Sequence, residues 1–568
     1  MTRILRVDLT TGKSTFEELP GRYKGLGGRG LTSAIVAAEV PPKADPLGPE
    51  NVVVFAPGII AGTSLPNSGR LSVGAKSPLT GTIKESNSGG SAARKLARLG
   101  ISALVLRGKS ADPVTITITK EGVAFRPASS LWGMGNYAAV ERLKAEFPGT
   151  GLITIGPAGE KMLKAAAVVV TSPDYLLRTA ARGGLGAVLG SKKVKAISVD
   201  DTDGPGVAIA RPEAFQAASK AVTDGVVKHP LTDGLRAYGT SLLVGMMNEM
   251  GGLSTRNFST GRFAAAEKIG GESLAAALNG RKGANAKHSC MAGCVIHCSQ
   301  VYTDEKGEFV TSGLEFETLG LVGSNCEIGD LDAIARIDRA CDDIGLDTID
   351  VGAAAGVAME AGRIPWGDGA RVLEVLESIR GDDPLGLLIG NGCAVTGKAL
   401  GVARVPVVKG QSLSAYDPRV LKGTGVTYAT APMGADHTCG NALPSPANPG
   451  YDPGCPSGQN QVSEFLQSYF AAIDTLGMCL FASIPILESP DLLRELTRAV
   501  AAKLGVELPD GYIQELGRGV VVAERAFNRL AGFGPGDDRL PGFLRRETLS
   551  PGGNVWDVPD EDLDKMFS

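Results

Sequence analysis

Three cysteines crowd into nine residues near the middle of the chain, as Cys290, Cys294 and Cys298. Thiolates are the ligands that iron–sulfur clusters need, and a short spacing lets one loop reach three corners of a cubane. Zinc is the alternative, because His288 and His297 lie beside the cysteines. Structural zinc usually pairs two short ligand hairpins, and this sequence has no second Cys-x-x-Cys or His-x-x-x-His pair. The spacing therefore favours a cluster over zinc, and either of these over three buried apolar cysteines.

A loop with three cysteines needs a fourth cluster ligand from elsewhere in the chain. Spacing does not choose among the remaining candidates, which are Cys326, Cys341, Cys393, Cys439, Cys455 and Cys479. A hydro-lyase cluster, which leaves one iron open and has three cysteine ligands, is a further alternative. Nine cysteines is an odd number, and in a reducing cytosol the pattern indicates cluster ligation more than disulfides.

Three side chains are candidates for acid–base work, namely Glu315, Glu317 and His437. Both glutamates lie in the mostly apolar segment 314–319, where burial would raise the pKa of a carboxyl and suit it to proton transfer. His437 is the only histidine after residue 297. A lone histidine is more often structural than catalytic, so its residue type alone assigns it no role.

Several glycine-rich turns combine backbone N–H groups with cations, an arrangement that binds pyrophosphates. They are Arg70, Lys76, the run Asn87-Ser88-Gly89-Gly90 before an expected helix at 91–99, and Arg182-Gly183-Gly184. Any one of them is explained equally well as a turn with a solvated charge. The run from Gly25 to Gly30 matches the dinucleotide-binding pattern, but it follows a polar segment where that motif needs a buried strand. We therefore reject dinucleotide binding by the run from Gly25 to Gly30.

Two later segments resemble each other, because Asp342–Asp347 and Asp474–Cys479 both read Asp-x-x-Gly-apolar-Asp/Cys. Each follows an amphipathic helical pattern and puts glycine where a left-handed C-terminal cap would lie. Two helical domains could therefore present matching loops to a central ligand. Two ordinary glycine-capped helices explain the pattern equally well.

The elements that must position these residues change along the chain. The first ~200 residues read as short strands and turns, with hairpins at 4–19 and 114–126, and later segments follow helical spacing. A linker is expected at 201–206. We therefore predict an α+β multidomain fold, with a β-rich N-terminal domain at residues 1–208 and two mainly helical domains at 209–415 and 416–568.

The composition is that of an ordinary globular protein. The 568 residues carry a net charge of −4 with a pI near 5.8, which gives no electrostatic case for nucleic acid or an anionic membrane. Glycine is in excess, at 77 residues against roughly 7% in average usage, which suggests close backbone approaches around a large ligand. The start lacks an apolar signal core and no apolar run reaches the ~20 residues that span a bilayer, so we expect a cytoplasmic protein.

Together these motifs resemble the tungsten-containing aldehyde:ferredoxin oxidoreductase family over nearly the whole chain. The ordered matches are Ile4–Gly12, Gly27–Leu31, Lys76–Gly81, Asn87–Gly90, Arg182–Ala187, the cysteine loop, Glu315–Glu317, both Asp-x-x-Gly segments, Tyr416–Arg419 and Glu524-Arg525. In that family a tungsten held by two pterins lies beside a [4Fe–4S] cluster. The resemblance thus implies a bis-pterin-binding N-terminal domain, tungsten or molybdenum, a cluster, and Mg²⁺ bridging the pterin phosphates.

The resemblance also implies roles for individual residues. The residues expected at the pterin phosphates and their magnesium are Arg70, Asn87, Gly89, Arg182 and Gly183, with Lys76 as a further cofactor-binding cation. The residues expected at the pterin rings are Asp342, Asp347 and Asp474. The cluster ligands would be Cys290, Cys294, Cys298 and Cys479. Glu317 and His437 match the family's acid–base residues, which shifts His437 from a structural to a catalytic role.

The implied reaction is oxidation of an aldehyde to a carboxylic acid, with electrons passing through the cluster to ferredoxin or a ferredoxin-like subunit. Alternatives are the metal subunit of a larger complex, such as a tungsten aryl-CoA reductase, and a non-catalytic iron–sulfur electron-transfer subunit. Two features depart from the family. Three residues separate Cys290 from Cys294 where the family has two, and no histidine lies between 298 and 436 for the Glu-x-x-His motifs that hold a bridging iron in some members. A homodimer that lacks the bridging iron stays an open alternative.

Overall fold

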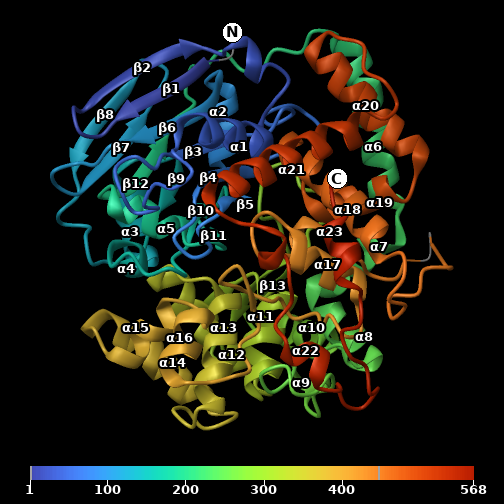
Figure 1. The fold of residues 1–568 in the computed structure, drawn as a ribbon. Helices are drawn as coiled ribbons and strands as arrows, with labels where there is room; N and C mark the ends of the chain where they lie inside the picture. The colour runs from blue at the N-terminus through green and yellow to red at the C-terminus, as the bar shows by residue number, and fades with distance from the viewer. Residues whose placement is uncertain (1–2, 446–447) are drawn as a thin grey trace.

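The computed structural model describes residues 3–445 and 448–568. Its N-terminal part contains two mixed six-stranded sheets (Figure 1). The first sheet has the order β2 (Lys13–Glu18), β1 (Arg3–Asp8), β6 (Ile101–Arg107), β3 (Val53–Pro57), β4 (Leu71–Lys76) and β5 (Ile83–Ser88). The second has the order β11 (Leu177–Ala180), β10 (Val168–Thr171), β9 (Gly151–Thr154), β12 (Val194–Val199), β7 (Val114–Ile118) and β8 (Val123–Pro127).

Both hairpins expected from the sequence are present. Strand β1 pairs antiparallel with β2, and β7 pairs antiparallel with β8. Crossover connections add parallel pairs, in which β1 lies beside β6 and β7 beside β12. Strand β2 forms an edge of the first sheet, and its Lys13, Glu17 and Glu18 are exposed. Charges on an edge strand oppose pairing with another chain.

Alternation along the strands sorts the side chains into layers. On β1, Leu5 and Val7 point into an apolar core shared with the second sheet, whereas Ile4 points to the opposite face. Helix α1 (Gly28–Glu39) covers that opposite face, and α3 (Asn136–Glu146) covers the outer face of the second sheet. In the central strands both faces of each sheet are therefore buried, and each fully buried apolar side chain contributes about 1.5–3 kcal/mol.

Beyond β12 the chain is mainly helical, which confirms the predicted fold class. The longer helices are α6 (Pro212–Lys228), α7 (Pro230–Tyr238), α8 (Leu242–Met250), α10 (Gly271–Gly280), α12 (Leu331–Ile344), α13 (Thr348–Glu360), α14 (Gly369–Glu377), α16 (Cys393–Leu400), α17 (Lys422–Thr430), α18 (Gln459–Leu476), α19 (Leu480–Leu487), α20 (Pro490–Leu504) and α21 (Tyr512–Ala531). A small sheet of β13 (Asn285–His288), β14 (Ser299–Thr303) and β15 (Phe309–Ser312) flanks the cysteine loop.

The two helices that precede the Asp-x-x-Gly motifs end as the sequence predicts. Helix α12 stops at Gly345 with φ +80°, and α18 stops at Gly477 with φ +75°. Both values lie in the left-handed region, where a side chain is strained and glycine is not. The motifs therefore turn the chain sharply out of each helix.

The helical part does not divide cleanly along the chain. Helix α6 packs against α20, so the start of the expected middle domain lies beside the expected C-terminal domain (Figure 1). Segment 201–206 contains neither helix nor strand and leads from β12 to α6. The boundaries at 208 and 415 stay predictions. Among the described residues, no helix has the length and apolar character needed to cross a membrane.

Candidate active site

The loop Asp474–Cys479 is pressed against the first sheet. A Cβ on Gly58, directly after β3, would lie 2.1 Å from the amide nitrogen of Gly477, so this contact requires glycine. The loop is also bonded through its backbone, because the Arg70 N–H donates to the Gly477 carbonyl at 3.1 Å. The Cys479 N–H donates to the Asn67 carbonyl at 2.7 Å. This contact and these bonds fix Cys479 beside the strand ends.

The loop Asp342–Asp347 is held against the second sheet by the same scheme. A Cβ on Gly156, just beyond β9, would lie 2.2 Å from a carbonyl oxygen of this loop. The Ala167 N–H donates to the Gly345 carbonyl at 2.9 Å, and the Asp347 N–H donates to the Ala165 carbonyl at 3.0 Å. Each sheet thus carries one Asp-x-x-Gly loop on its strand ends, and the expectation that both loops face a central ligand stays a prediction.

The three cysteines of the 290–298 loop meet Cys479 in one apolar cluster. Burial raises the pKa of Cys290 to about 12, and the neighbouring Cys479 raises it further. The pKa of Cys298 is also raised, first by burial and then by Glu315 and the other cysteines. Four thiols gathered in one apolar cluster are a donor set that a cationic iron–sulfur core would satisfy.

Asn67 ties the two halves of this cysteine cluster together. Its side-chain N–H donates to Cys294 Sγ at 3.3 Å, and its side-chain oxygen accepts from the Val295 N–H at 3.1 Å. Its main-chain carbonyl accepts the bond from Cys479. A hydrogen bond to a ligating sulfur is one of the means by which a protein tunes a cluster.

The two histidines of the zinc alternative are engaged elsewhere. His288 Nδ1 lies 2.9 Å from the Arg178 guanidinium, and its Nε2 lies 2.8 Å from Asp174. His297 Nδ1 bonds Ser289 Oγ at 2.7 Å. Within residues 3–445 and 448–568, no three His, Cys, Asp or Glu side chains are placed to hold a single metal ion.

Arg182 forms the centre of a buried polar cradle beside the first loop. Its Nε lies 3.4 Å from Asp347 Oδ2, and Asp347 also caps α13 by accepting from the Ile349 N–H. Two more guanidinium N–H groups donate to the carbonyls of Ala435, at 2.7 Å, and Ser412, at 2.5 Å. The carboxylates around it keep the pKa of Arg182 raised in spite of its burial.

A second cradle lies beside the second loop. The Arg70 guanidinium donates to the side chain and the main-chain carbonyl of Asn87, and Asn87 Nδ2 donates to Asp474 Oδ1 at 3.0 Å. Burial raises the pKa of Asp474 to about 6, although the nearby Arg29 lowers it. A Cβ on Gly89 would lie 3.0 Å from Cys290 Sγ, so this turn meets the cysteine loop directly.

Two further predicted cofactor residues, Lys76 and Asp342, make contacts outside the two cradles. The Lys76 ammonium donates to the carbonyls of Pro42 at 2.5 Å and Ala44 at 2.7 Å, so it holds a nearby loop, and its role as a cofactor-binding cation stays a prediction. Asp342 is buried at the start of the first loop and accepts from Tyr137 Oη at 3.5 Å. Burial raises its pKa well above the ordinary value.

The structure brings Glu317 and His437 together although 120 positions separate them in the chain. His437 Nε2 lies 3.2 Å from Glu317 Oε1, and its Nδ1 bonds Ser414 Oγ at 2.7 Å. The Ala415 N–H orients the other oxygen of Glu317 at 2.9 Å. Burial raises the pKa of Glu317, which makes its carboxylate a better base.

Glu315 faces the cysteines and not this pair. Its Oε2 accepts from Thr240 Oγ1 at 2.6 Å, and its charge raises the pKa of Cys298. Residues 315 and 317 therefore face different groups of side chains, and of the two glutamates only Glu317 contacts His437.

Comparison with known proteins identifies the family. The model described as aldehyde ferredoxin oxidoreductase, N-terminal domain, matches residues 4–201, and the model for domains 2 and 3 of the same protein matches residues 217–568. The chain belongs to the aldehyde ferredoxin oxidoreductase family. It is an oxidoreductase of this type, and the family resemblance of its motifs is confirmed.

Members of the aldehyde ferredoxin oxidoreductase family align with almost the whole chain. The tungsten-containing enzyme of Thermococcus kodakarensis is 36% identical over 578 residues, which cover 97% of this chain and 92% of that protein. The tungsten-containing enzyme of Pyrococcus furiosus is 34% identical over 579 residues, with the same coverage. Among solved structures, the BamBC active site complex of benzoyl coenzyme A reductase has a TM-score of 0.81 at 20% identity, covering 99% of this chain and 92% of that one. That likeness shows a shared fold.

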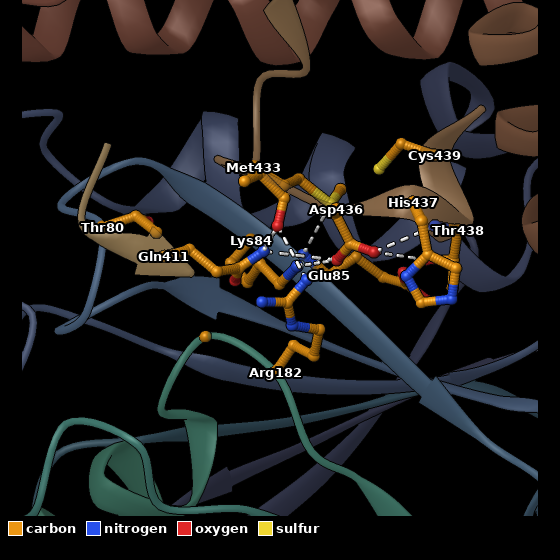
Figure 2. A network of polar contacts seen from close by, with 12 residues as sticks. Thr80, Lys84, Glu85, Arg182, Gln411, Met433, Asp436, His437, Thr438 and Cys439 are labelled. Carbon is orange, nitrogen blue, oxygen red and sulfur yellow. Dashed lines mark hydrogen bonds and ion pairs between the residues drawn. The ribbon is translucent and has the colours of Figure 1, made fainter. Parts of the chain in front are cut away.

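Other polar residues of this aldehyde ferredoxin oxidoreductase site were missed from the sequence. Lys84 and Asp436 form a buried ion pair at 2.7 Å, next to Arg182 (Figure 2). Arg29, fully buried, pairs with Glu524 at 2.8 Å and reaches Asp474 at 3.5 Å. Charged side chains inside strand β5 and helix α1 are the signal that could have found them, since such groups are almost never buried without a partner.

Proposed function

We propose that this protein oxidises an aldehyde to a carboxylic acid in the cytoplasm and passes the electrons to ferredoxin or a ferredoxin-like subunit. The observation that carries the proposal is the Glu317–His437 contact, which lies beside the buried Arg182 cradle. The identity of 36% to a tungsten-containing aldehyde ferredoxin oxidoreductase supports this chemistry over the alternatives.

The two cradles have the donor chemistry that a tungsten or molybdenum bis-pterin with Mg²⁺-bridged phosphates needs. The cations and turns that would hold the phosphates are Arg70, Asn87, Gly89, Arg182 and Gly183, and the carboxylates at the pterin rings would be Asp342, Asp347 and Asp474. Buried oxygens of Asp350 and Gln411, both near Arg182, have no hydrogen-bond partner. Such orphaned oxygens suit a ligand that brings its own donors.

The four thiols would hold the [4Fe–4S] cluster, with Cys479 as the fourth ligand. When bound, the metal and cluster would supply two-electron oxidation and one-electron transfer, chemistry that no side chain here can perform. Cys479 closes the loop that begins at Asp474, so one short segment connects the pterin site with the cluster site. This continuity favours the cluster as an electron relay.

The net reaction turns an aldehyde and water into a carboxylic acid, two protons and two electrons. Glu317 Oε1 is the group placed to accept a proton, because burial raises its pKa and the Ala415 N–H fixes its carboxylate. His437 Nε2 would donate a hydrogen bond to the aldehyde oxygen and so polarise the carbonyl. Ser414 holds the ring in place through Nδ1. Such positioned acid–base groups contribute about 10²–10⁴-fold.

The test compares Glu317→Gln and His437→Asn with a matched control. His229 forms a similar partly buried pair with Glu488 at 3.0 Å, and neither residue belongs to the proposed acid–base pair or cofactor set, so His229→Asn is the control. After anaerobic purification, metal content is measured and an aldehyde panel is assayed with a viologen dye. We expect kcat/KM to fall at least 10²-fold in the two site variants at unchanged metal content.

Three results would contradict the proposal. Unchanged rates in both site variants would remove Glu317 and His437 from the mechanism. About four irons per chain without tungsten or molybdenum would indicate an electron-transfer subunit. Turnover of aryl-CoA thioesters without any aldehyde oxidation would place the chain in a reductase complex.

A further inference from the structure

Lys84 is a buried lysine that neither the cofactor set nor the acid–base pair accounts for. It is the second residue of β5, and its ammonium contacts Asp436 Oδ2 at 2.7 Å. The two side chains are 0% and 5% exposed. Figure 2 shows the pair between Arg182 and the turn that carries His437.

Asp436 directly precedes His437 and organises the turn that carries it. Its Oδ1 accepts from the Thr438 N–H at 3.1 Å and from Thr438 Oγ1 at 2.7 Å, which caps the short helix His437–Cys439. One carboxylate oxygen therefore caps the turn while the other pairs with Lys84. The direction of the Asp436 side chain thus determines how the turn is held.

The stem of Lys84 is also packed against the Arg182 cradle. A Cβ on Gly183 would lie 2.5 Å from Lys84 Cγ, so the lysine chain fills the space that this glycine leaves. The Arg182 guanidinium in turn donates to the Ala435 carbonyl, one residue before Asp436. Lys84 is thus held by the turn Arg182-Gly183 on one side, and it holds the turn Asp436–Cys439 on the other.

We propose that Lys84 is a positioning residue for His437: it holds Asp436 in the capping orientation that keeps the imidazole against Glu317. This inference rests on the proposed function for its catalytic meaning. Lys84 touches neither the imidazole nor the carboxylate of that pair and acts through Asp436 alone.

The physical reason is the cost of an unpaired buried charge. Removing one partner of a buried ion pair leaves the other without compensation, and the structure then rearranges to find a new partner. Without Lys84, the groups left for Asp436 Oδ2 are the Gln411 amide, 3.5 Å away, and the Arg182 guanidinium, and a turn of the carboxylate towards either breaks the present arrangement. A displacement of about 1 Å at a catalytic group can cost ~10²-fold in rate.

The chain offers a closely matched control for this argument. Lys195 on β12 pairs with Glu160 at 2.5 Å, and these side chains are also 0% and 5% exposed. This second pair belongs to the same N-terminal part but packs beside Met134 and Ile155, away from the histidine turn. Lys195→Met therefore reports what loss of an equally buried ion pair does to the fold alone.

The experiment is a double-mutant cycle on the cofactor-loaded enzyme. Lys84→Met should lower kcat about 10²-fold with KM changed less than about threefold, and Asp436→Asn should also lower it because Lys84 is left unpaired. In Lys84→Met/Asp436→Asn the asparagine oxygen still caps Thr438 and no charge is stranded. We expect kcat of this double variant to return to within about tenfold of wild type, a rescue that double-mutant cycles are suited to detect.

A second readout follows His437 without any assay of turnover. The protein has four histidines, so the ring signals of histidine-labelled protein can be resolved by NMR and that of His437 assigned by its loss in His437→Asn. Lys84→Met should shift the His437 signal, and the double variant should restore it. Lys195→Met should destabilise the fold and leave both the signal and kcat per bound metal unchanged.

Two outcomes overturn the proposal. One is that Lys84→Met behaves like Lys195→Met, with lower stability but an unmoved His437 signal. The other is that the double variant is no better than either single variant in kcat and signal. If wild type oxidises no aldehyde at all, the proposed function fails, and the NMR comparison still decides the role of Lys84.

Discussion

The two Asp-x-x-Gly loops are held on the sheets in the same way, but they end in different residues. Each is clamped on a sheet through a contact that requires glycine, at Gly58 for one loop and Gly156 for the other. Each receives a backbone bond at its glycine and gives one from its last residue. The first loop ends in Asp347, which pairs with Arg182, and the second ends in Cys479, which joins the cysteine cluster.

We infer from this difference that one backbone arrangement serves two tasks. A carboxylate at the last position contributes charge to a cradle, whereas a thiol at the same position would make a cluster ligand. We infer that the first loop only orients a cofactor and that the second also forms the exit for electrons. Replacing residues that occupy equivalent places in the two loops tests this division.

The largest effect is expected from the residue in which the loops differ. Cys479→Ser should abolish the [4Fe–4S] cluster or strongly change its spectrum and potential, because one of four sulfur ligands is lost. Iron content and visible absorption measure this directly. Cys455→Ser, at a half-buried cysteine outside the cluster, is the control and should keep its iron. An unchanged spectrum in Cys479→Ser would show that the fourth ligand is another residue.

The next largest effect is expected at the two glycine contacts. Gly58→Ala and Gly156→Ala each force a methyl group against backbone atoms, and each should cost about 3 kcal/mol, the upper range for overpacking. Thermal unfolding measures the loss. Gly519→Ala in α21, where a Cβ meets no atom within 4 Å, should be neutral or stabilising.

The iron content of the same two variants then tests whether the two loops have different roles. Gly58→Ala should lower the iron content because its loop carries Cys479, whereas Gly156→Ala should keep its iron. Equal iron loss in both variants would contradict the division between an orienting loop and an electron-exit loop.

The smallest effect concerns the carboxyl that opens the second loop. Burial raises the pKa of Asp474 from 3.8 to about 6. Below pH ~4 the carboxyl is protonated in both the folded and the unfolded chain, and between ~4 and 6 only the folded chain keeps the proton. The free energy of unfolding of metal-free protein should therefore fall as pH rises through this range, by on the order of 2 kcal/mol.

Denaturant titrations at several pH values test this, with Asp474→Asn as the variant that should flatten the dependence. Glu85, whose pKa burial raises from 4.5 to about 8, gives a fall of its own between about pH 4.5 and 8, so the variant keeps that part of the dependence. Asp342→Asn should also weaken the fall of the unfolding free energy with rising pH, since burial raises the pKa of Asp342 as well. A wild-type curve that rises between pH 4 and 6 would contradict the assignment for Asp474.

Much of the fold could be read from local patterns. The β1–β2 and β7–β8 hairpins, the cap of α12 at Gly345 and that of α18 at Gly477 follow from alternation, helical spacing and glycine. Such features depend on neighbours in the chain. The packing of α6 against α20 depends on residues almost three hundred positions apart, and no local pattern contains it.

The sequence by itself determined which chemistry is available: three closely spaced thiols, a repeated Asp-x-x-Gly turn, and the family to which these motifs belong. Their residue types and short spacings carry this information, because ligand chemistry and turn geometry are local. Only the tertiary structure decided which distant groups meet. It joined Glu317 to His437, placed Glu315 at the cysteines, turned Lys76 to another loop, and paired Lys84 with Asp436. A buried charge needs a partner in space, and its position in the sequence does not say which one.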